Sequence, residues 1–254
     1  MSRNTALGFA QFEPPIRSDR QQSIELAPTE VDLWAYRLAG DAAYVDAWSW
    51  MLSREEMKHA DGYFHDTDRG DYIVAHGVLR LLLAQYCGLR PNELAFGREA
   101  NEKPFVVNRE AIDAEVTFNL AHSHGRALLA IARNRRVGVD LEHDRDDFDP
   151  LILARHFFFR SELAAILASP PHLQRDTFFR HWVAKESVLK AQGVGLSLPL
   201  DAFWVTFETD DKFARVQSLD PARLAADWFI RMLTLDTGWH GAVTASGEGW
   251  ELRL

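Results

Sequence analysis

The stretch from Gly138 to Gly195 constrains the fold more than any other part of this 254-residue chain. Asp140 and Glu142 stand two residues apart in an apolar, partly β-branched segment. A strand would therefore point both carboxylates to one face, because side chains alternate between the two faces of a sheet. Val139 and Leu141 would then face the core. The pattern predicts a half-buried strand with an acidic face.

Glu186 and Lys190 lie four residues apart within a helical pattern from Asp176 to Gln192. A helix places them on one face, one turn from each other. If this helix packs beside the acidic strand, three carboxylates and one ammonium converge, and carboxylate and phosphate oxygens are the ligands that Mg²⁺ prefers. The sequence thus favours a metal site for a phosphorylated ligand. Taken singly, each carboxylate is explained as well by a solvated strand or helix end.

Lys185 stands next to Glu186 on the apolar side of the same helix. Long basic side chains can pack their stem on apolar surface while the charged end reaches solvent. We therefore expect the stem of Lys185 to pack and its ammonium to reach the cleft.

Composition and charge exclude some classes of protein. The chain is 47% hydrophobic and 26% charged, which is ordinary for a globular protein, and it is long enough for one large domain or two smaller ones. Its net charge of −9 argues against a broad nucleic-acid-binding surface. Between Arg126 and Gly195, however, basic residues outnumber acidic ones. This local excess suits an anionic ligand.

A single cysteine, Cys87, excludes an internal disulfide framework and fits a reducing compartment. The N-terminus has no apolar signal segment, and no stretch approaches the ~20 apolar residues of a membrane span. We expect a cytoplasmic protein without membrane contact.

The order of predicted elements suggests two α+β halves of similar plan. Residues 1–29 are expected to form a flexible arm, 30–136 the N-terminal half, and 137–254 the C-terminal half that carries the metal site. In the first half, strands are expected near 31–38, 96, 105–107 and 116–120, with one helix capped by Ser53 and a long one from 66–68 to Gly88. In the second, helices are expected over 151–159, 161–168 with Ser161 as cap, and 176–192, followed by strands over 203–208, 213–216, 228–235 and 239–245.

Residues 128–132 and 137–142 are predicted to form a β-hairpin. The intervening turn, residues 133–136, holds three arginines, which we interpret as a solvated loop.

His122-Ser123-His124-Gly125 is a second cluster with chemical potential. Two histidines could bind zinc, but no cysteine is close and no further histidine has suitable spacing. His122 and Ser123 could instead donate hydrogen bonds to a phosphate. A serine hydrolase has little support, because no Gly-x-Ser-x-Gly elbow is present.

Four motifs in this order resemble those of the 4′-phosphopantetheinyl transferases of the long, surfactin-synthetase-activating type. They are Asn101-Glu102-Lys103-Pro104, Phe118-Asn119-Leu120-Ala121-His122-Ser123-His124-Gly125, Gly138-Val139-Asp140-Leu141-Glu142 and Trp182-Val183-Ala184-Lys185-Glu186-Ser187-Val188-Leu189-Lys190. Each motif alone is a weak signal, whereas all four in family order are specific.

The resemblance implies a fold of two pseudo-twofold-related halves, each a small antiparallel sheet with a packed long helix, and an active site between them. It implies transfer of 4′-phosphopantetheine from coenzyme A to a serine of an apo acyl or peptidyl carrier protein, with release of 3′,5′-ADP. No catalytic serine of the chain itself is then required. The enzyme is expected to be a monomer.

The resemblance also assigns roles to residues. Asp140, Glu142 and Glu186 would hold Mg²⁺, with Mn²⁺ as an alternative, on the diphosphate of coenzyme A. Glu186, directly or through water, would deprotonate the serine, while Lys190 and Lys185 would contact phosphates. The contacts expected at the nucleotide end are His122 and Ser123, the strand edge at Lys103-Pro104, and Arg69.

Three positions depart from the common family pattern. Ala121 stands where serine is usual before the motif histidine, Glu102 where glycine is common, and Asp71 where an arginine usually meets the nucleotide phosphate. Arg69 could compensate for the last. These departures concern nucleotide binding more than the metal triad.

Two other functions remain open from the residues alone. The same carboxylates and lysine would suit a metal-dependent phosphoesterase acting on a nucleotide without any carrier. A non-catalytic carrier-binding protein would retain binding when Glu186 is replaced by glutamine. The locally basic centre would suit an acidic carrier helix, with Arg155, Phe157, Phe158 and Arg160 as contacts, although these residues also fit an ordinary amphipathic helix.

Overall fold

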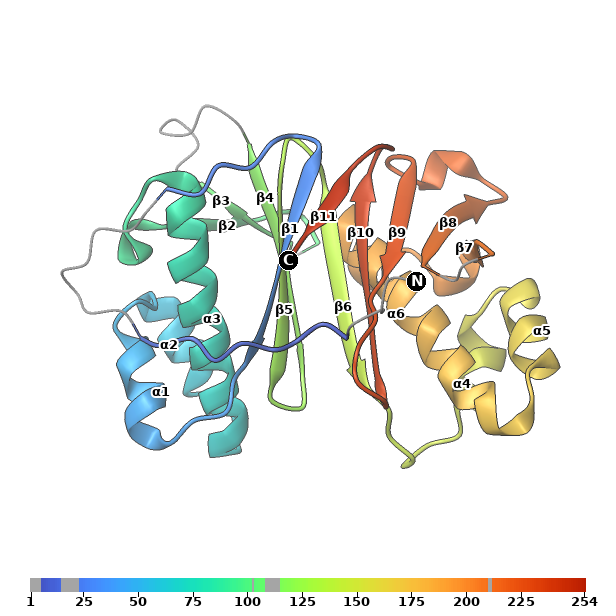
Figure 1. The fold of residues 1–254 in the computed structure, drawn as a ribbon, viewed down its shortest axis with the longest axis horizontal. Coiled ribbons are helices and arrows are strands. Elements are labelled where there is room, and N and C mark those ends of the chain that lie inside the picture. The colour runs from blue at the N-terminus through green and yellow to red at the C-terminus, as the bar shows by residue number, and fades with distance from the viewer. Residues whose placement is uncertain (1–5, 15–22, 102, 108–114, 210–211) are drawn as a thin grey trace.

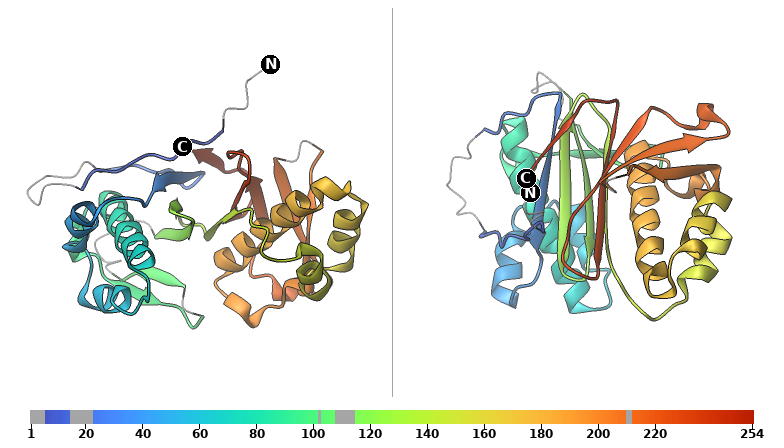
Figure 2. Two further views of the ribbon diagram at one scale, coloured as in Figure 1. Left: turned by 90° about the horizontal axis from the view of Figure 1, so that it is seen from below. Right: turned by 45° about the vertical axis from the view of Figure 1, so that its right-hand side comes forward.

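The computed structural model describes residues 6–14, 23–101, 103–107, 115–209 and 212–254. Two sheets stand beside each other, and helices cover the same side of both (Figures 1 and 2). Each sheet packs against one long helix, α3 (Asp66–Cys87) or α6 (Gln174–Gln192). The predicted fold class, two α+β halves each with a sheet and a long helix, is confirmed.

The N-terminal sheet has the strand order β11-β1-β5-β4 among the described residues. Its strands are β1 (Glu30–Arg37), β4 (Val116–Ser123), β5 (Arg126–Arg133) and β11 (Glu251–Arg253). The first three pair antiparallel, whereas β11 adds to β1 in parallel. Besides α3, this half contains α1 (Ala42–Ser49), α2 (Arg54–Ala60) and a short hairpin of β2 (Phe96–Arg98) and β3 (Pro104–Val106).

The C-terminal sheet is antiparallel in the order β6-β10-β9-β8-β7. Its strands are β6 (Val137–His143), β7 (Phe203–Phe207), β8 (Phe213–Ser218), β9 (Trp228–Met232) and β10 (Trp239–Ser246). Helices α4 (Pro150–Phe157) and α5 (Arg160–Ala168) precede α6 and pack against it through an aromatic cluster. None of the described helices is long and apolar enough to cross a membrane.

Helix ends follow the signals in the sequence at most places. Ser53 and Glu56 form the predicted capping box of α2. Gly88 and Gly193 end α3 and α6 with left-handed backbone, at φ of 66° and 70°. The cap predicted for α5 is wrong, because Ser161 lies inside the helix and Phe159 is the N-cap residue.

The predicted hairpin over residues 128–142 is also wrong. Strand β5 pairs with β1 and β4, while β6 pairs with β10 in the other sheet. Alternation of side chains identifies a strand but not its partner. The segment between them carries the chain from one sheet to the other, and its arginines are not a solvated loop. Arg135 donates to the carbonyls of Ser246 and Gly247, and Arg136 to those of Ala191 and Gln192.

The described part of the N-terminal arm is docked on the molecule. The backbone N–H of Leu7 donates to Thr234 O at 2.8 Å, and Ala10 exchanges backbone hydrogen bonds with Ala35 and Arg37 of β1. The arm thus runs across the side of both sheets that the helices leave open (Figure 2). Strand β11 likewise links the halves, because it comes from the end of the chain and joins the N-terminal sheet.

Candidate active site

The acidic face predicted for the strand around Asp140 is present on β6. Val139 and Leu141 are buried in an apolar cluster, and Asp140 and Glu142 alternate with them. In the β-ladder these two acids stand opposite Ala242 and His240 of β10. Both carboxylates therefore leave β6 on the face opposite that cluster.

Gly138 allows α6 to approach this strand closely. A Cβ atom at this position would lie 2.1 Å from Ser187 O and 2.3 Å from Ala191 N, and backbone atoms cannot move aside as a flexible side chain can. Only glycine fits between strand and helix here. The contact sets the helix so that the side chains of Glu186 and Lys190 meet β6.

Asp140 and Lys190 form the central contact of the site. Lys190 Nζ donates to Asp140 Oδ1 at 2.6 Å, and the aspartate side chain is only 5% exposed. The other oxygen, Oδ2, is buried without a hydrogen-bond partner in the described part of the chain. Burial acts to lower the pKa of Lys190, but Asp140, Glu186 and Glu142 outweigh it and raise that pKa. The lysine is therefore charged.

The remaining two acids are short of positive charge. Burial, and then repulsion by Asp140, raise the pKa of Glu142 to about 7. Burial and the same aspartate also raise the pKa of Glu186. A raised carboxylate pKa means that the charged form is poorly compensated. Lys190 thus faces three acids, and Arg145 adds a weaker attraction to Glu142 alone.

The donor set fits a hard divalent cation. Carboxylate oxygens are its preferred protein ligands, and added positive charge would relieve the repulsion among the acids. One buried oxygen of Asp140 also has no hydrogen-bond partner in the part of the chain that the structure describes. The side chains are not arranged as a finished metal cage: no group of three or more His, Cys, Asp or Glu residues within the described ranges is placed to hold a metal ion.

His122, at the end of β4, lies near this cluster. Desolvation and the charge of Lys190 lower the pKa of His122, whereas Asp68 of α3 raises it. The hydroxyl of Ser123 instead hydrogen-bonds the ring Nδ1 of His124 at 3.0 Å. Ala121 of β4 packs in the apolar cluster that also contains Val139 and Leu141 of β6. The hydroxyl of a serine at this position would therefore not reach the acidic face of β6.

Lys103 takes a different role from the one predicted. Its Nζ donates to Val137 O at 2.7 Å, Lys190 O at 2.6 Å and Ala191 O at 3.1 Å. Burial, together with nearby Arg136, lowers the pKa of Lys103 to about 7. The ammonium joins the β2–β3 hairpin to the last turn of α6 and is not available to a phosphate. Pro104, which follows it, lines a cavity of about 300 Å³ at the junction of the halves.

Lys185 does not reach the cleft, so that prediction is wrong. Its side chain is fully buried, and its Nζ binds both carboxylate oxygens of Glu162. Its ammonium therefore lies in a buried ion pair and cannot contact a phosphate.

Two predicted residues near the start of α3 have partners of their own. Arg69 forms an exposed ion pair with Asp61 at 3.2 Å. Burial and the neighbouring Asp68 raise the pKa of Asp71, and the backbone of Gly125 opposes this rise. Glu102 lies outside the described residues.

Sequence reasoning missed some contacts of the site. Trp182 stands beside Glu142 and opposes the burial-driven rise of its pKa, and Asn119 Oδ1 accepts the N–H of Val139 at 2.8 Å, which holds β4 beside β6. Trp182 is four residues before Glu186, so its place on the same helix face was readable from the sequence. Asn119 carried no such signal, because its partner belongs to the other sheet.

Comparison with known proteins agrees with this geometry. Residues 136–244 match the model of the 4′-phosphopantetheinyl transferase superfamily, and residues 41–134 match the N-terminal model of 4′-phosphopantetheinyl transferases. A 4′-phosphopantetheinyl transferase of Bacillus subtilis is 30% identical over 159 residues, covering 63% of this chain and 68% of its own length. The chain belongs to the 4′-phosphopantetheinyl transferase superfamily.

Two further relatives of this superfamily extend over more of the chain. The transferase HetI of a Nostoc species is 29% identical over 231 residues, covering 90% of this chain and 93% of HetI. The transferase Sfp of Bacillus subtilis is 26% identical over 195 residues, covering 77% and 82% of the two chains. This phosphopantetheinyl transferase is thus an enzyme that uses coenzyme A as substrate and carrier proteins as acceptors, as predicted.

Proposed function

We propose that Asp140, Glu142 and Glu186 bind Mg²⁺, or Mn²⁺ in its place, together with the diphosphate of coenzyme A. The observation that carries this proposal is the convergence of the three acids on Lys190, with one buried oxygen of Asp140 lacking a hydrogen-bond partner among the described residues. The bound ion would supply positive charge to the diphosphate oxygens, on which negative charge grows during transfer.

The side chains of the site have separate tasks in this reaction. Glu186, directly or through a water molecule, accepts the proton of the carrier serine, and its raised pKa suits a base that works near neutral pH. The serine oxygen attacks the phosphorus that bears pantetheine, and the bond from that phosphorus to 3′,5′-ADP breaks. Lys190 stabilises the negative charge of the departing diphosphate oxygen.

The nucleotide end is proposed to contact the N-terminal half. His122 and Ser123 end β4 beside the acidic cluster, and Pro104 begins β3 at the junction of the halves. Arg69 can join them only by leaving Asp61, with which it forms an exposed pair. Lys103 can contribute only its backbone, since its ammonium is bound to three carbonyls.

The carrier protein is proposed to dock on α4. Ile152 and Phe157 are 55% and 45% exposed, and Arg155 is exposed between them along the helix. Exposed apolar side chains together with a basic residue on one helix suit an acidic, amphipathic carrier helix. Phe158, also expected there, is only 6% exposed and packs in the core under the helix. Both sides of the site come from one chain, so we propose that a monomer is active, and its net charge of −9 argues against a nucleic-acid partner.

The direct test is transfer to a carrier. The protein is incubated with coenzyme A, MgCl₂ and a panel of apo acyl and peptidyl carrier proteins, and each carrier is weighed by mass spectrometry. We expect a gain of one phosphopantetheine that chelation of the metal abolishes. Glu186→Gln should lose the reaction while still folding, whereas the matched control Glu208→Gln, an exposed acid paired with Arg215, should retain it. No mass gain on any carrier would refute the proposal.

A further inference from the structure

Glu162 and Lys185 form a buried ion pair that the proposed reaction does not use. Their side chains are 1% and 0% exposed, and Lys185 Nζ lies 2.9 and 2.7 Å from the two carboxylate oxygens of Glu162. The ammonium also donates to Phe203 O at 2.6 Å. Lys185 directly precedes Glu186, so this contact fixes the helix at the residue next to the proposed base.

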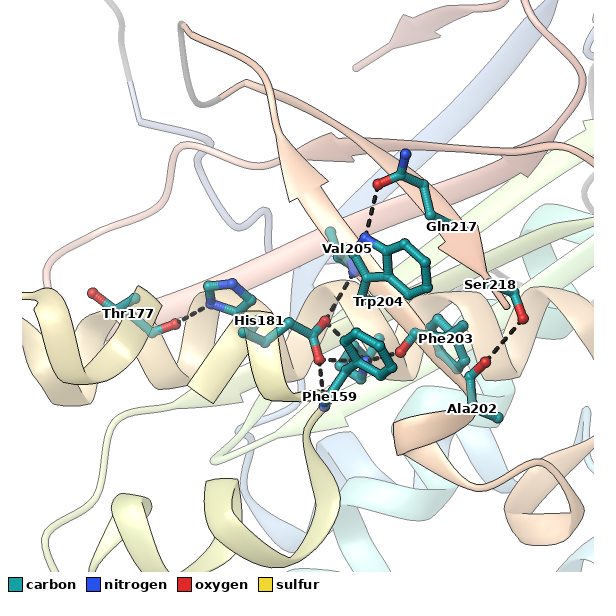
Figure 3. Close-up of polar contacts among 11 residues, drawn as sticks. Phe159, Thr177, His181, Ala202, Phe203, Trp204, Val205, Gln217 and Ser218 are labelled. Atoms are coloured by element: carbon teal, nitrogen blue, oxygen red, sulfur yellow. Dashed lines mark hydrogen bonds and ion pairs between the residues drawn. The ribbon is translucent and has the colours of Figure 1, made fainter. Parts of the chain in front are cut away.

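The carboxylate of Glu162 has partners in two further places. It accepts the backbone N–H of Val205 at 2.9 Å and that of Phe159 at 3.0 Å. Figure 3 shows Phe159, Phe203 and Val205 gathered around the hydrogen bonds of the pair. One ion pair thus joins the start of α5, the middle of α6 and the strand β7.

Stability alone does not account for charges at this position. Burial lowers the pKa of Lys185 and raises that of Glu162, and each partner opposes the shift of the other. Apolar side chains of similar volume often stabilise a fold as well as a buried ion pair does. Apolar residues cannot supply directional contacts. Here three hydrogen bonds from Lys185 tie α6 to Glu162 and Phe203, and two more tie Glu162 to Val205 and Phe159.

The neighbouring elements are those that the reaction must bring together. Helix α6 carries Glu186 and Lys190 towards β6, and α5 directly follows α4, the proposed carrier-docking helix. We propose that the Glu162–Lys185 pair is a positioning device: it holds α6 at a fixed orientation to α5 and β7, so that the serine of a docked carrier meets Glu186. This inference rests on the proposed docking face and base.

The deciding variant removes both charges and keeps a hydrogen-bond acceptor. In Glu162→Gln/Lys185→Met, the amide oxygen can still accept one of the two backbone N–H groups, and no unpaired charge is left in the core. We expect a folded protein with a melting temperature near that of the wild type and an unchanged KM for coenzyme A. A displacement near 1 Å can cost as much as 100-fold in rate, so kcat should fall by about ten- to a hundred-fold.

Separate measurements of kcat and of folding distinguish a positioning role from a purely structural one. A merely structural role predicts that kcat stays at the wild-type value when folding is retained, and that result would overturn the proposal. If the double variant does not fold, Glu162→Asp decides, since it keeps both charges but withdraws the carboxylate by one methylene. A folded Glu162→Asp variant with wild-type kcat would equally overturn the proposal.

Two controls keep the inference separate from the proposed function. Asp32→Asn/Arg253→Met removes another charge pair, in which Asp32 is buried and Arg253 is exposed, with Nε–Oδ1 of 2.8 Å. This pair touches neither α5 nor α6, so its loss should leave kcat unchanged. Glu186→Gln reports on the base itself. Retained activity in Glu186→Gln would sink the proposed chemistry, whereas retained activity in the double variant alone would sink only the positioning role.

Discussion

Lys190 Nζ lies 2.6 Å from Oδ1 of Asp140, while the second oxygen of that carboxylate is buried and unpaired among the described residues. Glu142 and Glu186 stand close enough for Asp140 to raise the pKa of both. Lys190 therefore faces three acids, and only Glu142 has the further, weaker attraction of Arg145. Added positive charge at this place would lower the free energy of the folded protein.

Replacing Asp140 by asparagine should separate metal binding from folding. The variant keeps the shape of the side chain but removes the charge that holds Lys190, so we expect kcat to fall by about 100-fold or more. Thermal unfolding measured with and without MgCl₂ should show stabilisation by the ion in the wild type and none in Asp140→Asn. Asp146→Asn, an exposed acid in the following loop, should behave as the wild type. Equal stabilisation of the wild type and Asp140→Asn would contradict the metal assignment.

Gly138→Ala should damage both the fold and the site. The added Cβ would meet Ser187 O at 2.1 Å and Ala191 N at 2.3 Å, so α6 must move away from β6. Overpacking of this kind typically lowers the free energy of unfolding by about 1–3 kcal/mol, and urea unfolding of the variant should show a loss of this size. Activity should fall further than stability, since the shift also separates Glu186 from Asp140. Gly8→Ala, where a Cβ has no neighbour within 4 Å, should change neither quantity.

The strand and helix that carry the site could be predicted from the sequence, whereas the strands with which they pair could not. Alternation around Asp140 and the four-residue spacing of Glu186 and Lys190 are local patterns, and both describe the structure correctly. The pairing of β5 and β6 failed because it depends on contacts between distant segments, such as Asn119 with Val139. No local pattern indicates these contacts.

The contacts of Lys103 and Lys185 show a second limit of prediction from sequence. Both lysines belong to recognisable motifs, yet the ammonium of one binds backbone carbonyls at the end of α6 and that of the other a buried carboxylate. Residue type and spacing show that a cation is present. They do not show whether it faces a cleft or an ion-pair partner elsewhere in the chain, here Glu162, which lies 23 residues before Lys185.

Acid should destabilise the protein partly through His181. Burial lowers the pKa of this histidine to about 4, and its Nδ1–H donates to Thr177 O at 2.8 Å. In the unfolded chain His181 takes up a proton near pH 6.5, whereas in the folded protein it does so only near pH 4. Stability contributed by the neutral ring is thus present above pH 6.5 and lost as the pH falls towards 4, by about 2–3 kcal/mol.

The comparison of two histidine variants tests this window. Urea unfolding of His181→Gln between pH 7 and 4.5 should show a weaker pH dependence than the wild type, because the glutamine does not titrate. His172→Gln, at an exposed position, should keep the full dependence. Parallel curves for His181→Gln and the wild type would show that another group causes the acid sensitivity.

Lys103→Met tests whether the β2–β3 hairpin supports the catalytic helix. Methionine matches the stem of the lysine but removes the donor from the carbonyls of Val137 and Lys190, while the carbonyl of Ala191 keeps its hydrogen bond from Arg136. Unpaired buried carbonyls cost about 1–3 kcal/mol, so the urea midpoint should fall, and kcat should fall with it because the turn that carries Lys190 loses its anchor. Lys58→Met, an exposed lysine on α2, controls for the loss of one positive charge. If Lys103 served the nucleotide instead, the variant would raise KM for coenzyme A at unchanged stability, and the two measurements together separate these roles.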